Sequence, residues 1–182
     1  APCLLPVAPP MTGIKIGKIS GFTIRVDFSW FIVFFLILWT FTIGVFPTTV
    51  PGLGHLAYFA MGISATLLFF VSLLLHELSH SFVARAKGIP VDGITLFIFG
   101  GIAHTRAEAE RPRDEFAIAG AGPLCSLALA ALMGVLLYGA GRAGLGPEFI
   151  IVLQQLMVLN VAIAVFNLLP GFPLDGGHIL RA

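Results

Sequence analysis

Long apolar stretches constrain this chain more than any other feature of its sequence. Four of them, at about residues 28–46, 55–84, 116–138 and 149–169, each supply the roughly 20 residues of helix that cross a hydrocarbon core. With 58% hydrophobic and 10% charged residues, the chain also falls outside the soluble range, which is about 25% charged. The sequence therefore predicts an all-α membrane protein, built as a polytopic bundle of transmembrane helices in the lipid bilayer.

The basic residues indicate which way these helices cross the membrane, because Lys and Arg accumulate on the cytoplasmic side. If the N-terminus is cytoplasmic, nine of the ten basic residues are inside, and Arg142 alone is outside. The nine are Lys15, Lys18, Arg25, Arg85, Lys87, Arg106, Arg111, Arg113 and Arg181. The formal net charge of +1 provides no large basic field, so we expect no nucleic-acid partner.

The second apolar stretch ends in the pattern His-Glu-Leu-Ser-His at residues 76–80. Positions i and i+4 share one face of a helix, so His76 and His80 can bind one metal ion while Glu77 reaches a water on that ion. The pattern also arises by chance on surface helices, but an unmatched Glu in a bilayer costs at least about 2.5 kcal/mol. We interpret the histidines as metal ligands and Glu77 as a general base.

A catalytic zinc usually has three protein ligands and one open position, so two histidines leave it one ligand short. The candidate third ligand is Asp175, which follows the fourth apolar stretch where prolines and glycines let the backbone turn. Two imidazoles and one carboxylate favour Zn²⁺. The alternative for Asp175 is a helix-capping carboxylate at the membrane surface.

Residues 93–104 are too few for a spanning helix, but they are rich in β-formers around Gly100 and Gly101. They predict a short re-entrant β-hairpin, whose backbone must be covered by protein or face a water-filled cavity at membrane depth. We expect it beside the metal site, where one strand edge can pair with an unwound substrate. The alternative is an apolar surface loop.

Several motifs together resemble the site-2 protease family of intramembrane zinc metalloproteases. They are His-Glu-Leu-Ser-His at 76–80, Phe-Gly-Gly at 99–101, Ala-Gly-Pro at 121–123 and Asn-Leu-Leu-Pro-Gly-Phe-Pro-Leu-Asp-Gly-Gly at 167–177. The resemblance runs from about residue 15 to the last residue. It implies cleavage in or near transmembrane segments of membrane-tethered regulatory proteins, and we expect a prokaryotic cell membrane with the active site toward the cytoplasm.

The resemblance also implies roles for individual residues. His76, His80 and Asp175 would bind zinc, Glu77 would be the general base, and Asn167 would hold the substrate or its oxyanion. An interhelical hydrogen bond is the alternative for Asn167. Phe99, Gly100 and Gly101 in the hairpin are the remaining candidate substrate-binding residues.

The sequence also predicts where the folded domain begins and how it ends. Residues 1–14 are expected to be a disordered or foreign segment, because four prolines in the first ten residues oppose a regular helix. Residues 15–182 are expected to be a protease core truncated at its C-terminus, since the family usually continues with further helices.

Two other functions fit a polytopic chain with these ligands. A membrane metal-ion transporter would place several polar sites along a path, whereas this sequence concentrates its ligands at one depth. An inactive scaffold relative would lack Glu77 or a ligand, and all four residues are present.

Overall fold

The computed structural model describes residues 13–98, 100–105, 107, 109, 111–169 and 175–181. The strands are β1 (Ile14–Ile19), β2 (Phe22–Val26), β3 (Val91–Phe97) and β4 (Gly100–Thr105). The helices are α1 (Phe28–Trp39), the π-helical η1 (Thr40–Val45), α2 (Phe46–Thr49), α3 (His55–Ala86), α4 (Pro112–Arg142), α5 (Pro147–Leu168) and α6 (Asp175–Arg181). Most of the predicted N-terminal segment, residues 1–12, lies outside the described residues.

Four helical segments are long and apolar enough to cross a membrane, which confirms the predicted bundle. They are Phe28–Thr49, His55–Ala86, Pro112–Arg142 and Pro147–Leu168. Large apolar side chains point outward from these helices: Phe35, Leu124 and Val135 are 61%, 70% and 69% exposed. Such a surface is costly in water and suits lipid.

The predicted hairpin is present as β3 and β4, but it belongs to a larger sheet than the sequence predicted. The strand order is β1-β2-β3-β4, with antiparallel outer pairs and a parallel central pair in which Thr23–Val26 of β2 align with Gly93–Leu96 of β3. A parallel pair needs a long crossover, and here the first two spans supply it. The predicted fold had placed no strands before the first span.

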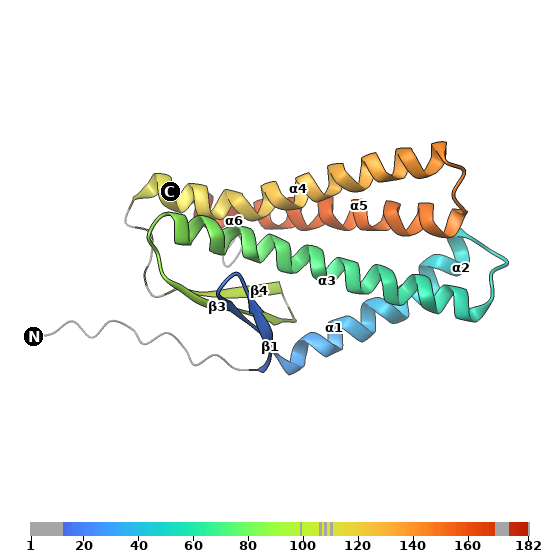
Figure 1. Ribbon diagram of the computed structural model, residues 1–182, viewed down its shortest axis with the longest axis horizontal. Helices are drawn as coiled ribbons and strands as arrows, with labels where there is room; N and C mark the ends of the chain where they lie inside the picture. Colours follow the sequence, from blue (N-terminus) through green and yellow to red (C-terminus); the bar gives the residue numbers. More distant parts are fainter. Residues whose placement is uncertain are drawn as a thin grey trace, which may run out of the picture.

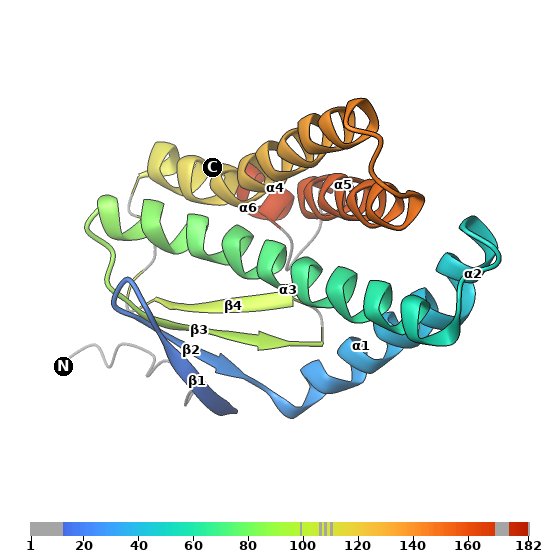
Figure 2. The same ribbon diagram turned by 45° about the vertical axis from the view of Figure 1, so that its right-hand side comes forward.

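The sheet packs against the second half of α3 through one face (Figure 2). Side chains of β2 and β3 form this core with Leu78 of α3, in a cluster of Phe22, Ile24, Val26, Leu78, Ile94 and Leu96. Within β2 the buried and half-buried residues alternate, as they do in a strand with one face against a core. The hairpin is thereby fixed beside the helix that carries the histidine pattern.

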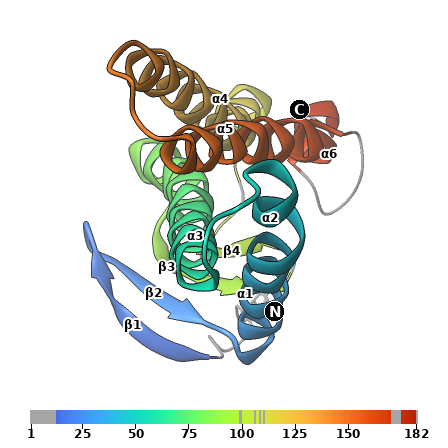
Figure 3. The same ribbon diagram turned by 90° about the vertical axis from the view of Figure 1, so that its right-hand side faces the viewer.

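Seen along the long axis, α3 lies between two layers (Figure 3). The sheet covers one side of α3, and α4 and α5, which pack against each other, cover the opposite side. The end of α3, the start of α4, the end of α5 and the sheet all lie at one end of the molecule (Figure 1). Residues from four separate elements therefore meet there.

The junction between the sheet and the first span is held by hydrogen bonds. Oδ1 of Asp27 caps α1 by accepting from the backbone N–H and hydroxyl of Ser29, at 2.9 and 2.6 Å. These bonds hold the pKa of Asp27 below its usual value. The Ser29 hydroxyl in turn accepts from the N–H of Ile98, at 3.2 Å, in the turn between β3 and β4. The hairpin tip is thus tied to the first span.

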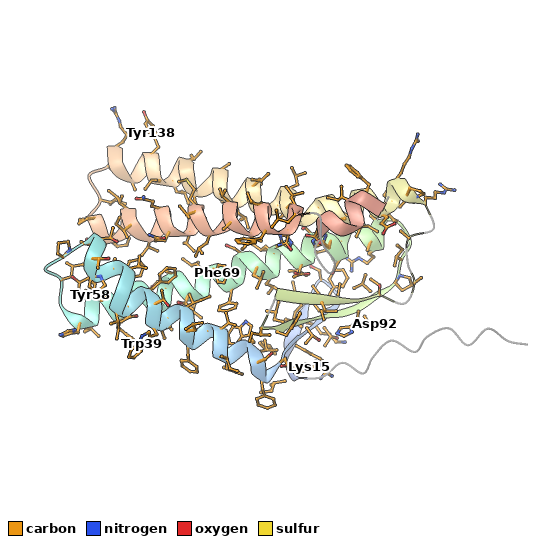
Figure 4. The ribbon with its side chains drawn as sticks, turned by 180° about the vertical axis from the view of Figure 1, so that it is seen from behind. Lys15, Trp39, Tyr58, Phe69, Asp92 and Tyr138 are labelled. Carbon is orange, nitrogen blue, oxygen red and sulfur yellow. The ribbon has the colours of Figure 1, made fainter. Side chains whose placement is uncertain are left out.

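The two ends of the bundle differ in their polar side chains. Lys15 and Asp92 lie at the sheet end, and Tyr138 lies at the opposite end (Figure 4). At the sheet end, Lys87 after α3 forms an ion pair of 2.8 Å with Asp114 in the first turn of α4. Tyr138 is 72% exposed, as expected of an aromatic residue at a membrane interface.

Candidate metal centre

Three predicted ligands meet at one point between α3 and α6. Nε2 of His76 and Nε2 of His80 lie 3.2 Å apart, and Oδ2 of Asp175 lies 3.3 and 3.2 Å from them. The two imidazoles are one helical turn apart on α3 and are both buried. The fold therefore brings together residues almost a hundred positions apart in the chain.

This triangle fits a tetrahedral zinc ion. Bonds of about 2.0–2.1 Å to nitrogen and oxygen at tetrahedral angles separate the ligand atoms by roughly 3.3 Å. All three sides of the observed triangle are close to that value. Two neutral imidazoles and a carboxylate are also a donor set that zinc prefers. Among the described residues, these three are the His, Cys, Asp or Glu side chains that lie close enough together to hold one metal ion.

The opposite side of each imidazole is held by α4. Nδ1 of His76 lies 2.9 Å from Oγ of Ser126, and Nδ1 of His80 lies 2.6 Å from the carbonyl oxygen of Ile118. Gly122 lies between these two positions on α4 and faces the Nε2 atoms of both imidazoles. Sequence analysis did not single out Ser126 or Ile118. The four-residue spacing of 118, 122 and 126, which puts them on one helix face, was the available signal.

Glu77 lies on the side of α3 that faces the sheet. Its carboxylate rests against the backbone of Gly100 and Gly101 at the start of β4. Gly100 has φ of +136°, a conformation that side-chain-bearing residues rarely adopt, so the tight turn into β4 depends on glycine. The predicted proximity of the hairpin to the metal centre is thus observed for Gly100 and Gly101, whereas Phe99 lies outside the described residues.

A cavity of about 330 Å³ adjoins the metal centre and leads toward the loop between β4 and α4. One end is formed by Glu77, His80 and Asp175. The remaining lining residues are mostly small or apolar: Ala84, Ile89, Ala103, Thr105, Ala107, Ala109, Glu115, Ile118 and Ala119. The cavity therefore extends from the metal centre to the ends of α3 and β4 and the start of α4.

Asn167 makes a hydrogen bond within its own helix, and its predicted role toward the substrate stays a prediction. It lies near the end of α5 and its Nδ2 donates to the carbonyl oxygen of Ile163, one turn earlier in the same helix, at 2.9 Å. The side chain does not line the cavity beside Glu77. The amide nitrogen carries two hydrogens, so it can keep this bond and still donate to a substrate.

Comparisons with known proteins agree with the geometry. The family model for peptidase family M50 matches residues 64–143 and 145–182. The Rip3 protein of Mycobacterium tuberculosis is 38% identical over 169 residues, which are 93% of this chain and 43% of that protein. Zinc metalloprotease MJ0392 of Methanocaldococcus jannaschii is 39% identical over 116 residues, 64% of this chain and 33% of that protein. This chain therefore spans less than half the length of these relatives.

A solved structure has the same overall arrangement. The site-2 protease from Methanocaldococcus jannaschii aligns with 93% of this chain and 70% of its own, at a TM-score of 0.61 and 28% sequence identity. The family model covers both the histidine pattern on α3 and Asp175 on α6. On this evidence the chain belongs to peptidase family M50, in agreement with its resemblance to the site-2 proteases.

Proposed function

We propose that this protein is a zinc-dependent endopeptidase that hydrolyses peptide bonds in or near transmembrane segments of membrane-tethered regulatory proteins. The observation that carries the proposal is the placement of Glu77 beside the triangle of His76, His80 and Asp175, on a helix long enough to span a membrane. Relatives named zinc metalloprotease and site-2 protease support it. A membrane-spanning protein is then the substrate partner.

His76, His80 and Asp175 would hold the zinc ion, and the equal sides of their triangle support that assignment. Zinc, when bound, supplies the Lewis acidity that polarises a carbonyl group and makes water acidic enough to lose a proton near neutral pH. Burial of both imidazoles keeps bulk water from competing for their nitrogen atoms.

Glu77 is the general base of this proposal. It is next to a ligand in sequence, yet its carboxylate points toward β4 and the cavity. A carboxylate placed there can take a proton from the attacking water and later give it to the leaving amine. Contact with the backbone of Gly100 and Gly101 fixes its direction.

A substrate helix must unwind before its peptide bonds can react, because its carbonyl groups are engaged in intrahelical hydrogen bonds. β4 is the terminal strand of the sheet on the side of Glu77, so one of its edges is available for an extended segment. Gly100 and Gly101 would bind the substrate backbone there, with Phe99 beside them. Asn167 would donate to the oxyanion through the second hydrogen of its amide nitrogen.

The distribution of basic residues supports one orientation of the bundle in the membrane. Lys15, Arg85 and Lys87 belong to the sheet and the end of α3, on the same side of the bundle as the metal centre. Because Lys and Arg accumulate on the cytoplasmic side, we infer that the N-terminus and the cavity face the cytoplasm. Substrate fragments would leave toward that compartment.

Cleavage of a labelled single-span substrate in liposomes tests the proposal, with Glu77→Gln as the variant. We expect both proteins to bind one equivalent of zinc and only the parent to cleave. Equal cleavage by both would exclude Glu77 as the base. Zinc bound by both, with zinc transported into the liposomes and no cleavage, would favour a transporter, and neither activity would favour a scaffold.

Proline substitutions on β4 test the substrate edge. The N–H groups of neighbouring strand residues point to opposite edges, so one of Ile102 and Ala103 directs its N–H toward β3 and the other toward the free edge. The edge-facing proline is expected to leave the unfolding temperature near that of the parent and to abolish cleavage. Full cleavage by that variant would exclude strand addition at β4.

A further inference from the structure

We propose that α4 positions the two metal-binding imidazoles, with Ser126 and the Ile118 carbonyl as positioning groups and Gly122 as the residue that leaves room for the metal ion. The inference rests on the metal site of the proposed function. Ile118, Gly122 and Ser126 are spaced four residues apart, so they form one line along the face of α4 that packs against α3.

The His80 contact determines which ring nitrogen carries hydrogen. A carbonyl oxygen can only accept, so Nδ1 of His80 must donate its hydrogen to Ile118 over the 2.6 Å that separates them. In the neutral imidazole the lone pair is then on Nε2, which is the atom that faces His76 and Asp175. The carbonyl of α4 therefore selects the tautomer that can bind a metal ion at Nε2.

The carbonyl of Ile118 can serve α4 and His80 together. In a regular helix it accepts from the N–H of Gly122, four residues on. A carbonyl oxygen has two lone pairs, so it can also accept from Nδ1 of His80. The contact with His80 therefore needs no break in α4, which runs from Pro112 to Arg142.

His76 is oriented in the same way by a hydroxyl group. Ser126 is fully buried, and its Oγ lies 2.9 Å from Nδ1 of His76. If Ser126 accepts from Nδ1–H, the lone pair of His76 is also on Nε2, and both ligand atoms then face the same point. A partner on the remote nitrogen is the usual way in which proteins fix the ring direction of a metal-binding histidine.

Gly122 accounts for the close approach of α4. A Cβ atom on residue 122 would overlap Nε2 of His80 and would lie 2.5 Å from Nε2 of His76. Any side chain would therefore enter the space between the two ligand atoms. Gly120, on the same helix, has no atom within 4 Å of its Cβ position, so its substitution provides a matched control.

The test measures zinc affinity by chelator competition, and the spectrum of bound Co²⁺, for the protein in detergent. Ser126→Ala is expected to weaken zinc binding by about 10–100-fold, the usual effect of removing such a partner, and to alter the Co²⁺ bands. The control is Ser72→Ala, which removes a buried hydroxyl of α3 that contacts Asn160 and Leu68 and no imidazole. We expect parental affinity for that control.

The second pair of variants is Gly122→Ala and Gly120→Ala. The first is expected to abolish stoichiometric zinc binding, and the second to leave it unchanged, with both proteins showing cooperative thermal unfolding. Parental affinity and Co²⁺ spectrum in Ser126→Ala, or equal losses in Ser126→Ala and Ser72→Ala, would overturn the positioning role. A parent protein that binds no zinc would overturn the metal site itself and, with it, this inference.

Discussion

The side chain of Glu77 fills the space in which a side chain at residue 101 would lie. A Cβ atom on Gly101 would be 2.7 Å from Cδ and 3.1 Å from Oε1 of Glu77, well inside van der Waals contact. The candidate general base and the edge strand β4 therefore depend on each other for their positions. This contact joins two motifs that are separate in the sequence.

Gly101→Ala is expected to lower kcat/KM for cleavage by about 100-fold, because displacing a catalytic group by about 1 Å has effects of that size. Zinc content should stay at the parental level, since the three atoms nearest to the added Cβ all belong to Glu77 and to no metal ligand. The control is Gly17→Ala on β1, where the added Cβ meets nothing within 4 Å. Parental cleavage by Gly101→Ala would show that Glu77 does not need its observed position.

Metal removal is expected to destabilise the protein as well as inactivate it. Asp175 is the ligand that joins α6 to α3, so an ion bound by all three residues stabilises the folded state over the unfolded one. A free zinc concentration 100 times the Kd contributes about 2.7 kcal/mol. Thermal unfolding with zinc or with a chelator measures this shift, which Asp175→Asn should largely remove. An equal shift in that variant would exclude Asp175 as a ligand.

Gly62→Ala is expected to weaken the docking of the first span on α3. The added Cβ would overlap Oγ1 of Thr42 and would lie 3.3 Å from Cδ1 of Leu38. Overpacking at such a contact costs about 1–3 kcal/mol, which denaturation in mixed micelles can measure. Gly44→Ala in η1 has an open Cβ position and should unfold like the parent. Equal stability of the two variants would contradict this close packing.

The stability of the sheet is expected to fall as the pH drops below about 6.5, the ordinary pKa of histidine. Burial lowers the pKa of His104, Asp92 raises it and Arg25 lowers it further, which leaves it below its usual value. The unfolded chain therefore binds the proton more readily, and acid favours unfolding until the pH passes the folded-state pKa.

His104→Gln should remove this part of the pH dependence. Glutamine keeps a polar group that can bond to Thr95, whose hydroxyl lies 2.9 Å from Nε2 of His104. Unfolding temperatures between pH 7.5 and 5 measure the difference between the two proteins. Parallel pH profiles of the parent and the variant would exclude His104 as the titrating group.

The sequence was sufficient to predict those structural features that depend on a single stretch of the chain. The four spans follow from uninterrupted apolar length, and the shared face of His76 and His80 follows from the helical period. The turn between β3 and β4 follows from Gly100, whose positive φ suits glycine. These features depend on local geometry and on the thickness of a bilayer.

Parts of the sheet could have been predicted and were not. Phe22, Ile24 and Val26 alternate with polar residues in a period of two, which is typical of a strand with one buried face. β1 has no such face, since most of its residues are exposed. Its pairing with β2, and the parallel pairing of β2 with β3, depend on partners that the local sequence does not identify.

Only the tertiary structure decided which side of each span faces the metal centre. In water, an apolar stripe marks the inner face of a helix, but lipid is as apolar as the protein interior, so hydrophobicity does not distinguish the two faces of a span. No apolar stripe therefore marked the direction of Ser126 on α4 or of Asn167 on α5. The fold turns Ser126 toward His76 and Asn167 toward Ile163 of its own helix. The sequence determined which metal-binding and acid–base residues the chain contains. Helix packing decided which other side chains and backbone groups contact them.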